Sequence, residues 1–228
     1  MKGVFQPSRF TINSSFWIST KIEHPRQKPG TKLKQIQESL TCYGSDKTTH
    51  HDYQFPYSVL FDCMVPGSLI EIGIGTKNTK MNSNMHWYKN AKPGGSLRAW
   101  SSLGIFEKII GGDLDEEILF NEGNISTFKV DQTKIESFYE FKKNCLNTAK
   151  VISFIIDDGL HQAKANLNTF EALFPILAEG GIYAIEDVNS KDLHQIMKSI
   201  LIDFKIKDWA LWGNSLRSPN NGLFVIFK

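Results

Sequence analysis

From residue 67 onward, short apolar runs rich in Val, Ile and Phe alternate with stretches of helical spacing. This alternation predicts βαβ units, and therefore a mainly parallel sheet with helices on both faces. Near-continuous apolar runs, such as VISFIID at residues 151–157, are typical of strands that are buried on both faces. We expect seven strands, at residues 68–74, 107–113, 125–131, 151–157, 181–186, 206–212 and 222–227.

The last two predicted strands are joined by a loop that contains Ser-Pro-Asn-Asn-Gly at residues 218–222. This loop is too short for a crossover helix, so we expect the final pair to be antiparallel. The expected fold is therefore a Rossmann-like α/β fold whose mainly parallel sheet closes with a C-terminal antiparallel hairpin. That ending is expected of a methyltransferase rather than of a plain dinucleotide-binding fold. Helices are expected at residues 32–41, 51–62, 133–147, 161–177 and 190–204.

The length of 228 residues suits one such domain with a short appendage. Prolines and Gly30 interrupt any period within residues 1–31. We expect an N-terminal arm and a short helix over residues 1–42, followed by one catalytic domain over residues 43–228. The arm is a candidate cover for the site or a candidate contact in a homo-oligomer.

Charge and cysteine usage exclude several classes of protein. The formal net charge is only +2 and the lysines are scattered, which weighs against a nucleic-acid partner. Cys42, Cys63 and Cys145 are odd in number and far apart, which excludes a full disulfide framework and a cysteine zinc site. No apolar run reaches the roughly 18 residues of a membrane span, and the start shows no apolar signal segment. We expect a cytoplasmic protein with a small-molecule substrate.

A glycine-rich turn, EIGIGTKNTK, follows the first predicted strand. Gly73 and Gly75 would let the backbone approach a ligand at the carboxyl end of that strand. The third glycine of the dinucleotide motif is absent, and a polar stretch up to Gly94 replaces the helix that a pyrophosphate requires. This favours a cofactor without phosphates, such as S-adenosylmethionine, over NAD. Glu71 faces either the methionine amino group or its own backbone surroundings.

Acids at the ends of the second and third predicted strands are candidates for binding the nucleoside part of the cofactor. Asp113 is the preferred acceptor for the ribose hydroxyls, with Asp115 in reserve because it could instead cap a helix that begins at Glu116. Asp131 and Gln132 are candidates for binding the adenine amino group and bordering its ring. Asp131 has an equal alternative as the N-cap of the next helix.

Two neighbouring strands end in adjacent acids, in FIIDDGLH and YAIEDV. Carboxylates crowded in this way repel one another unless a cation or a shared proton offsets their charge. Asp158, Glu186 and Asp187 offer only oxygen donors, which suits Mg²⁺ or another divalent cation. His161 follows Asp158 by one turn and is a candidate general base for a hydroxyl nucleophile. Asp157 is a candidate for binding the cofactor. The alternative is that it only orients Asp158 or the glycine turn.

The segment YGSDKTTHHDY, from Tyr43 to Tyr53, places charged, hydroxyl and imidazole groups ahead of the first strand. We expect it to fold back over the cofactor, with Asp46 and Lys47 near the methionine end. The alternative is a solvated loop. Candidate contacts for the acceptor are His50, His51 and Tyr53 here, and His86, Trp87 and Tyr88 in the polar stretch after the glycine turn.

The ordered set GSDKTTHHDY, IEIGIG, GGSLRAW, GGDLDE, VDQT, IDDGLH and IEDV closely resembles metal-dependent sugar O-methyltransferases of the macrocin and mycinamicin type. Their wider family includes polysaccharide methyltransferases and cephalosporin hydroxylase-like proteins. The resemblance spans roughly residues 43–188. It implies an O-methyltransferase that uses S-adenosylmethionine and Mg²⁺ on a hydroxyl of a sugar, a glycosylated small molecule or a polysaccharide.

By this resemblance, His161 is the base, and the residues that bind metal and cofactor fall where the strands end. The chain departs from the family at Leu160, which replaces a small polar residue, and it lacks the large N-terminal domain of the macrolide enzymes. The implied metal ligands are Asp158, Glu186 and Asp187, and the implied cofactor contacts are Glu71, Asp113, Asp131 and Gln132.

Three other functions compete with this interpretation. A non-haem-iron oxygenase requires two histidines and one carboxylate, whereas this sequence clusters one histidine with several acids. A methyltransferase with a non-sugar acceptor is a second alternative. If that acceptor were a nucleic-acid base, an Asn/Asp-Pro-Pro-aromatic loop would be expected where Asp-Asp-Gly-Leu-His stands. A non-catalytic binding module on the same fold is the third.

Overall fold

The computed structural model describes residues 30–81, 83, 85, 92–213 and 222–228. The expected arm, the candidate acceptor contacts His86, Trp87 and Tyr88, and most of the loop at residues 218–222 lie outside these residues. Within the part of the chain that the structure describes, no helix combines the length and apolar character needed to cross a membrane.

The described strands form one sheet in the order β3-β4-β2-β1-β5-β6-β8-β7. Strands β1, β2, β4, β5 and β6 are parallel to their neighbours in this group. Strand β8 is antiparallel to both β6 and β7, which confirms the predicted C-terminal hairpin. The strands are β1 (Gly67–Ile72), β2 (Phe106–Asp113), β3 (Asn121–Glu122), β4 (Ile125–Lys129), β5 (Ile152–Asp157), β6 (Leu177–Val188), β7 (Trp209–Gly213) and β8 (Gly222–Phe227).

The sheet corrects the expected strand count, because the described residues contain eight strands rather than seven. The additional strand, β3, has only two residues and pairs antiparallel with β4 at one edge. Gly123, with φ +58°, forms the tight turn between them. Two residues are too few to show an alternating pattern, so the sequence alone carried no signal for this strand.

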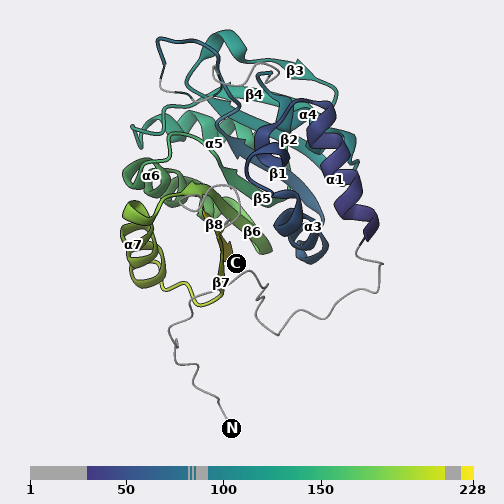
Figure 1. Ribbon diagram of the computed structural model, residues 1–228. Helices are drawn as coiled ribbons and strands as arrows, with labels where there is room; N and C mark the ends of the chain where they lie inside the picture. Colours follow the sequence, from purple (N-terminus) through teal and green to yellow (C-terminus); the bar gives the residue numbers. More distant parts are fainter. Residues whose placement is uncertain (1–29, 82, 84, 86–91, 214–221) are drawn as a thin grey trace.

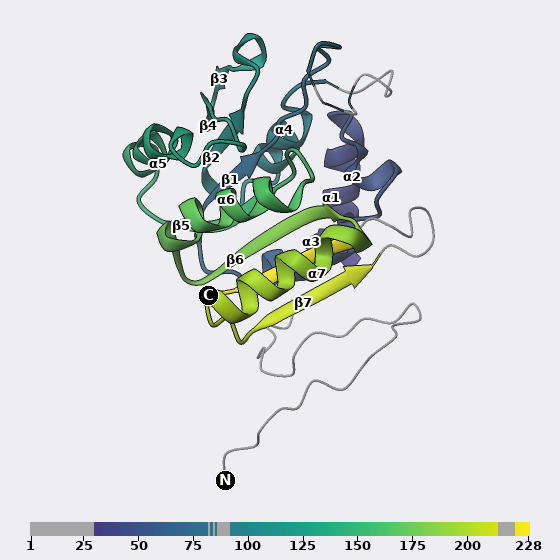
Figure 2. The same ribbon diagram turned by 90° about the vertical axis from the view of Figure 1, so that its left-hand side faces the viewer.

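Helices cover both faces of the sheet (Figures 1 and 2). One face carries α1 (Gly30–Cys42), α3 (Gln54–Cys63) and α4 (Gly95–Ser102), and the other carries α5 (Ser137–Thr148), α6 (Ala163–Leu173) and α7 (Ser190–Lys198). A short helix, α2 (Asp46–Thr49), lies between α1 and α3 in the chain. Helix α1 packs into the core through Ile36 and Leu40, which are fully buried.

Several helices begin later or end earlier than their apolar spacing predicted. The helix expected at 133–147 begins at Ser137, and the one expected at 161–177 ends at Leu173. A separate 3₁₀ turn with Pro175 in its first turn follows Leu173, because proline cannot donate the backbone hydrogen bond that would continue α6. Helix α3 begins at Gln54 rather than 51, and α7 continues as a π-turn over Ser199–Asp203.

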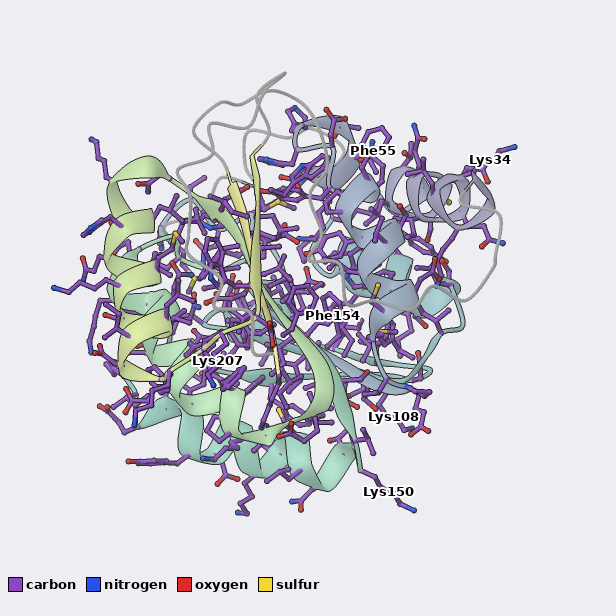
Figure 3. All side chains as sticks on the ribbon, turned by 90° about the horizontal axis from the view of Figure 1, so that it is seen from below. Lys34, Phe55, Lys108, Lys150, Phe154 and Lys207 are labelled. Atoms are coloured by element: carbon purple, nitrogen blue, oxygen red, sulfur yellow. The ribbon has the colours of Figure 1, made fainter. Side chains whose placement is uncertain are left out.

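Each face of the sheet has its own apolar layer. Phe154 and Ile156 of β5 point to the layer under α1, α3 and α4, whereas Ile155 points to the layer under α5 and α6. Viewed from below, Phe154 lies among packed side chains, while Lys34 and Lys150 point outward (Figure 3). This two-sided burial is the arrangement that the near-continuous apolar run at 151–157 predicted.

The strand order places β1 between β2 and β5. The chain leaves β1 toward β2 and β4, and later returns on the other side of β1 through β5 and β6. Such a reversal of strand order opens a crevice at the carboxyl ends of the strands, which is where open α/β sheets bind ligands. The sequence motifs at these strand ends are therefore brought to one place.

Candidate active site

A cavity of about 390 Å³ lies at this crevice. It is lined by the segments that follow β1, β2, β4 and β5, by Asp187 near the end of β6, and by residues of the segment before α3. Of the predicted site residues, those that line the cavity are Asp46, Lys47, Gly73, Gly75, Asp113, Asp131, Gln132, Asp158, His161 and Asp187. Glu71, Asp157 and Glu186 are buried behind this lining.

The glycine turn after β1 has the backbone conformation that requires glycine. Gly73 and Gly75 have φ of +88° and +86°. A Cβ on Gly73 would lie 2.1 Å from the backbone oxygen of Asp158, and the Gly73 amide donates to Gly112 O at 2.8 Å. The turn is therefore pressed against the ends of β2 and β5. In the described part of the stretch after the turn, the next α-helix is α4, which begins at Gly95.

Replacing Gly73 by alanine is expected to destabilise the fold by about 3 kcal/mol, because the added methyl overlaps the Asp158 backbone and φ is strained. Urea unfolding followed by circular dichroism measures this loss. Gly104→Ala is the matched control: φ there is +67°, but nothing lies within 4 Å of the added Cβ. It should lose only about 1 kcal/mol. Equal losses in both variants would contradict a contact-based requirement at Gly73.

The two acids after β2 have different roles. Asp113 lines the cavity and its carboxylate accepts hydrogen bonds from the amides of Ile74 (2.9 Å) and Asp115 (3.0 Å). Burial raises the pKa of Asp113, although these amides oppose the shift. Asp115 caps the 3₁₀ turn at Glu116–Ile118 and accepts from the Thr76 hydroxyl. The structure therefore gives Asp115 the capping role and leaves Asp113 facing the cavity.

After β4, Asp131 and Gln132 turn in different directions. Asp131 accepts from the amide and hydroxyl of Thr133 and pairs with Lys134 at 2.9 Å. Burial opposes ionisation of Asp131, but these contacts outweigh it and lower the pKa. Asp131 thus forms a local turn rather than the helix N-cap, which is Glu136.

Gln132 points inward, toward Asp157. Its Nε2 donates to Asp157 Oδ1 and to Thr169 Oγ1, both at 2.7 Å, and its Oε1 accepts from the amide of Leu160. The second oxygen of Asp157 accepts from Asn166 Nδ2 at 3.0 Å. Asp157 is fully buried, so the structure places it as the anchor of the loop that carries Asp158. Direct contact of Asp157 or Gln132 with a cofactor stays a prediction.

Lys47 of α2 is buried, and its ammonium lies among three carboxylates. Its Nζ is 2.5 Å from Asp158 Oδ2, 2.7 Å from Glu186 Oε2 and 3.4 Å from Glu71 Oε1. Burial would lower the pKa of Lys47, but these negative charges outweigh it and raise the pKa well above its ordinary value. Lys47 is therefore a fixed cation at the meeting point of β1, β5 and β6.

The two glutamates behind the cavity are fully hydrogen-bonded. Glu71 accepts from Ser96 Oγ at 2.7 Å and from Trp100 Nε1 at 2.8 Å. Glu186 accepts from the Tyr57 hydroxyl and from Lys47. Glu71 thus contacts α4 and Lys47, while its contact with the cofactor and metal binding by Glu186 stay predictions.

Asp158, His161 and Asp187 face one another across the cavity. His161 Nε2 is 3.9 Å from Asp158 Oδ1 and 3.9 Å from Asp187 Oδ2. One ligand atom from each residue lies within 4.8 Å of the others, so together they could hold a metal ion. Burial raises the pKa of Asp158 to about 7, against the opposing pull of Lys47. Two carboxylates and one imidazole therefore converge on the cavity.

Both His161 and Asp187 have unusual backbones, with φ of +52° and +53°. A non-glycine residue with positive φ is strained and persists only where its surroundings hold it. The His161 conformation also delays α6, which begins at Ala163 instead of at residue 161. At Asp187 the holding group is Tyr53, whose hydroxyl donates to Asp187 Oδ1 at 2.7 Å and accepts from its amide at 3.1 Å.

The segment before α3 folds onto the site, as predicted, but with different roles for its residues. Of the three predicted acceptor contacts here, only His51 lines the cavity, and its Nδ1 is 3.2 Å from Asp187 Oδ1. Tyr53 is fully buried behind Asp187, and His50 is exposed. Sequence reasoning missed Tyr57 as the partner of Glu186. Its apolar neighbours in α3 suggested only a core position, and no local pattern shows a contact 129 residues away.

Comparisons with known proteins show which proteins the chain is similar to. No protein-family model matches the chain. The 8-demethyl-8-alpha-L-rhamnosyl tetracenomycin-C 2'-O-methyltransferase of Streptomyces olivaceus is 29% identical over 152 residues, covering 65% of this chain and 36% of that protein. The mycinamicin VI 2''-O-methyltransferase of Micromonospora griseorubida is 32% identical over 121 residues, covering 53% of this chain and 27% of that protein.

A structural relative is the MycE methyltransferase from the mycinamycin biosynthetic pathway, solved in complex with Mg and SAH. Its TM-score is 0.60 at 21% identity, over 85% of this chain and 54% of that chain. These comparisons confirm the Rossmann-like methyltransferase fold and the resemblance to sugar O-methyltransferases of the mycinamicin and macrocin type. The chain spans only about a third of the length of the curated relatives it matches.

Proposed function

We propose that the chain is an S-adenosylmethionine-dependent, divalent-metal-assisted O-methyltransferase that acts on a hydroxyl of a sugar, most simply one attached to a small molecule. The observation that carries this proposal is the convergence of Asp158, His161 and Asp187 on one cavity beside the glycine turn. The relatives support the class of acceptor, since they are a rhamnosyl tetracenomycin-C 2'-O-methyltransferase and a mycinamicin VI 2''-O-methyltransferase. A nucleic-acid partner is not expected, and a homo-oligomer stays a prediction.

The donor atoms fit a hard divalent cation. Asp158 and Asp187 turn oxygens toward the cavity, where one atom from each could hold the ion. Behind them, Lys47 pairs with Glu71, Asp158 and Glu186. Mg²⁺ prefers oxygen to nitrogen ligands, which favours the two aspartates as its holders and leaves His161 free to accept a proton. A bound Mg²⁺ would lower the pKa of a coordinated hydroxyl.

His161 presents one nitrogen to this chemistry. Its Nδ1 is buried and has no hydrogen-bond partner among the described residues, while Nε2 faces both carboxylates. We assign Nε2 the role of accepting the hydroxyl proton as the oxygen attacks the sulfonium methyl, whose bond to sulfur breaks so that neutral S-adenosylhomocysteine leaves. Asp158 and Asp187 stabilise the imidazolium that results, and the enclosing residues hold donor and acceptor in line.

The cavity also offers polar groups that could bind the cofactor. Asp113 is assigned to the ribose hydroxyls, and Gly73 and Gly75 allow a close backbone approach. Asp131 lines the same cavity and is assigned to the adenine side. Asp46 and Lys47 line it from the segment before α3, and we assign Asp46 to the methionine amino group.

The proposal is tested by incubating the protein with methyl-labelled S-adenosylmethionine, Mg²⁺ and pairs of rhamnosylated polyketides and their aglycones. Label is expected on the glycosides and not on the aglycones, with NMR locating the new methyl on a sugar oxygen. Absence of S-adenosylhomocysteine binding in calorimetry would contradict the proposal. Turnover that requires Fe²⁺ and 2-oxoglutarate would instead support the oxygenase alternative. A non-haem-iron oxygenase uses two histidines and one carboxylate, whereas the described cluster has one histidine and two carboxylates.

A further inference from the structure

The two aspartates that face the cavity share one geometric feature. Each has one oxygen bound by a residue of the segment before α3, and each turns its other oxygen toward His161. In Asp158, Oδ2 lies 2.5 Å from Lys47 Nζ, while Oδ1 lies 3.9 Å from His161 Nε2. In Asp187, Oδ1 receives the Tyr53 hydroxyl at 2.7 Å, while Oδ2 lies 3.9 Å from His161 Nε2.

The residues that bind these oxygens are themselves immobilised. Lys47 and Tyr53 are buried, at 1% and 0% exposure. The Tyr53 ring stacks on His51 at a centroid distance of 5.3 Å and meets Tyr57 edge-on at 6.4 Å. Lys47 is held by Glu186, which Tyr57 fixes in turn. Figure 2 shows α2, which carries Lys47, beside the carboxyl end of the sheet.

The Tyr53 hydroxyl does more than bind one oxygen. It also accepts the Asp187 amide at 3.1 Å, so a single atom bridges the backbone and the side chain of a residue whose φ is +53°. Because this bridge spans both groups, it sets the direction of the Asp187 carboxylate. Without the hydroxyl, the contact that remains at Asp187 Oδ1 among the described residues is His51 Nδ1, at 3.2 Å.

We propose that Lys47 and Tyr53 are positioning residues of the metal site: each occupies one oxygen of an aspartate and so leaves a single, aimed oxygen for the cation. The inference rests on the proposed function, because it concerns the same metal. It assigns to the segment Lys47–Tyr53 a task different from contact with the cofactor or the acceptor. Residues that orient metal ligands in this way typically strengthen metal binding by about 10- to 100-fold.

Tyr53→Phe is the decisive variant, since it removes the hydroxyl and keeps the ring packing. With S-adenosylhomocysteine present, calorimetric titration with Mn²⁺ should show a dissociation constant raised by about tenfold. Affinity for S-adenosylhomocysteine should stay within about twofold, because the hydroxyl does not line the cavity. In turnover assays the Mg²⁺ concentration for half-activation should rise, while kcat at saturating Mg²⁺ recovers most of its original value.

Tyr139→Phe, on the exposed face of α5, is the matched control and should change none of these quantities. Lys47→Arg keeps the charge but replaces the compact ammonium, and it should weaken Mn²⁺ binding in the same way if it folds. Unchanged Mn²⁺ affinity in folded Tyr53→Phe would overturn this inference and leave the proposed function standing. No Mn²⁺ binding by the unaltered protein would overturn both.

Discussion

Replacing His161 by alanine is expected to lower kcat by about 10²- to 10⁴-fold, the usual contribution of a general base. An aliphatic hydroxyl is a weak nucleophile at neutral pH, so its proton must leave as the carbon–oxygen bond forms. His161 Nε2 is the imidazole nitrogen that faces both cavity aspartates, at 3.9 Å from each. The measurement is methyl transfer from labelled S-adenosylmethionine under saturating Mg²⁺ and acceptor.

The loss must be separated from damage to the fold or to cofactor binding. His161 lies at a strained position, so His161→Asn, which tolerates positive φ, accompanies the alanine variant. S-adenosylhomocysteine affinity should stay within about threefold in both, because the interactions lost are with the reacting hydroxyl. His194→Ala, on the exposed face of α7, should retain full activity. Normal turnover in both His161 variants would mean that another group accepts the proton.

Much of this fold follows from patterns that are local in the sequence. The apolar runs located the long strands, and the short final loop predicted an antiparallel ending because it cannot hold a crossover helix. The strand β3 and the delayed starts of α5 and α6 were not predicted. At α6, the positive φ of His161 and the extended backbone of Gln162 keep the helix from beginning before Ala163, and neither leaves a trace in apolar spacing.

The candidate site, like the fold, is predictable from the sequence where it depends on local patterns and not where it depends on distant contacts. That Asp158, His161 and Asp187 converge follows from parallel strands ending at one edge of the sheet, so adjacent acids at those ends predict a cluster. Which acids face the cavity depends on partners far away in the chain. Glu186 and Asp187 are neighbours in sequence, yet one is turned to Lys47 and Tyr57 and the other to the cavity.

Lys47 changes the electrostatic interpretation of the cluster. From the sequence, a metal was the simplest cation to offset the crowded carboxylates. The structure shows that a buried ammonium already offsets part of this charge, at Glu71, Glu186 and one oxygen of Asp158. The charge that remains lies at Asp187 and at the second oxygen of Asp158. The need for a metal is thus confined to the part of the cluster that faces the cavity.

Removal of divalent metal is expected to abolish methyl transfer, with activity falling by more than about 100-fold after EDTA treatment and returning on addition of Mg²⁺. Without a cation, the cavity oxygens of Asp158 and Asp187 lie near each other uncompensated, and the acceptor hydroxyl keeps its ordinary pKa. The Lys47 ion pairs persist, so the fold and S-adenosylhomocysteine binding should survive. Calorimetry and thermal unfolding on the EDTA-treated protein check both.

The pattern of metal rescue discriminates between mechanisms. Mn²⁺ should restore activity together with Mg²⁺, because oxygen ligands bind both ions. Mg²⁺ should also raise the melting temperature, since a ligand that binds only the folded state stabilises it, whereas Asp158→Asn should remove most of that rise. Full activity in EDTA would show that Lys47 alone supplies the positive charge the reaction needs. The carboxylates would then serve His161 rather than a metal.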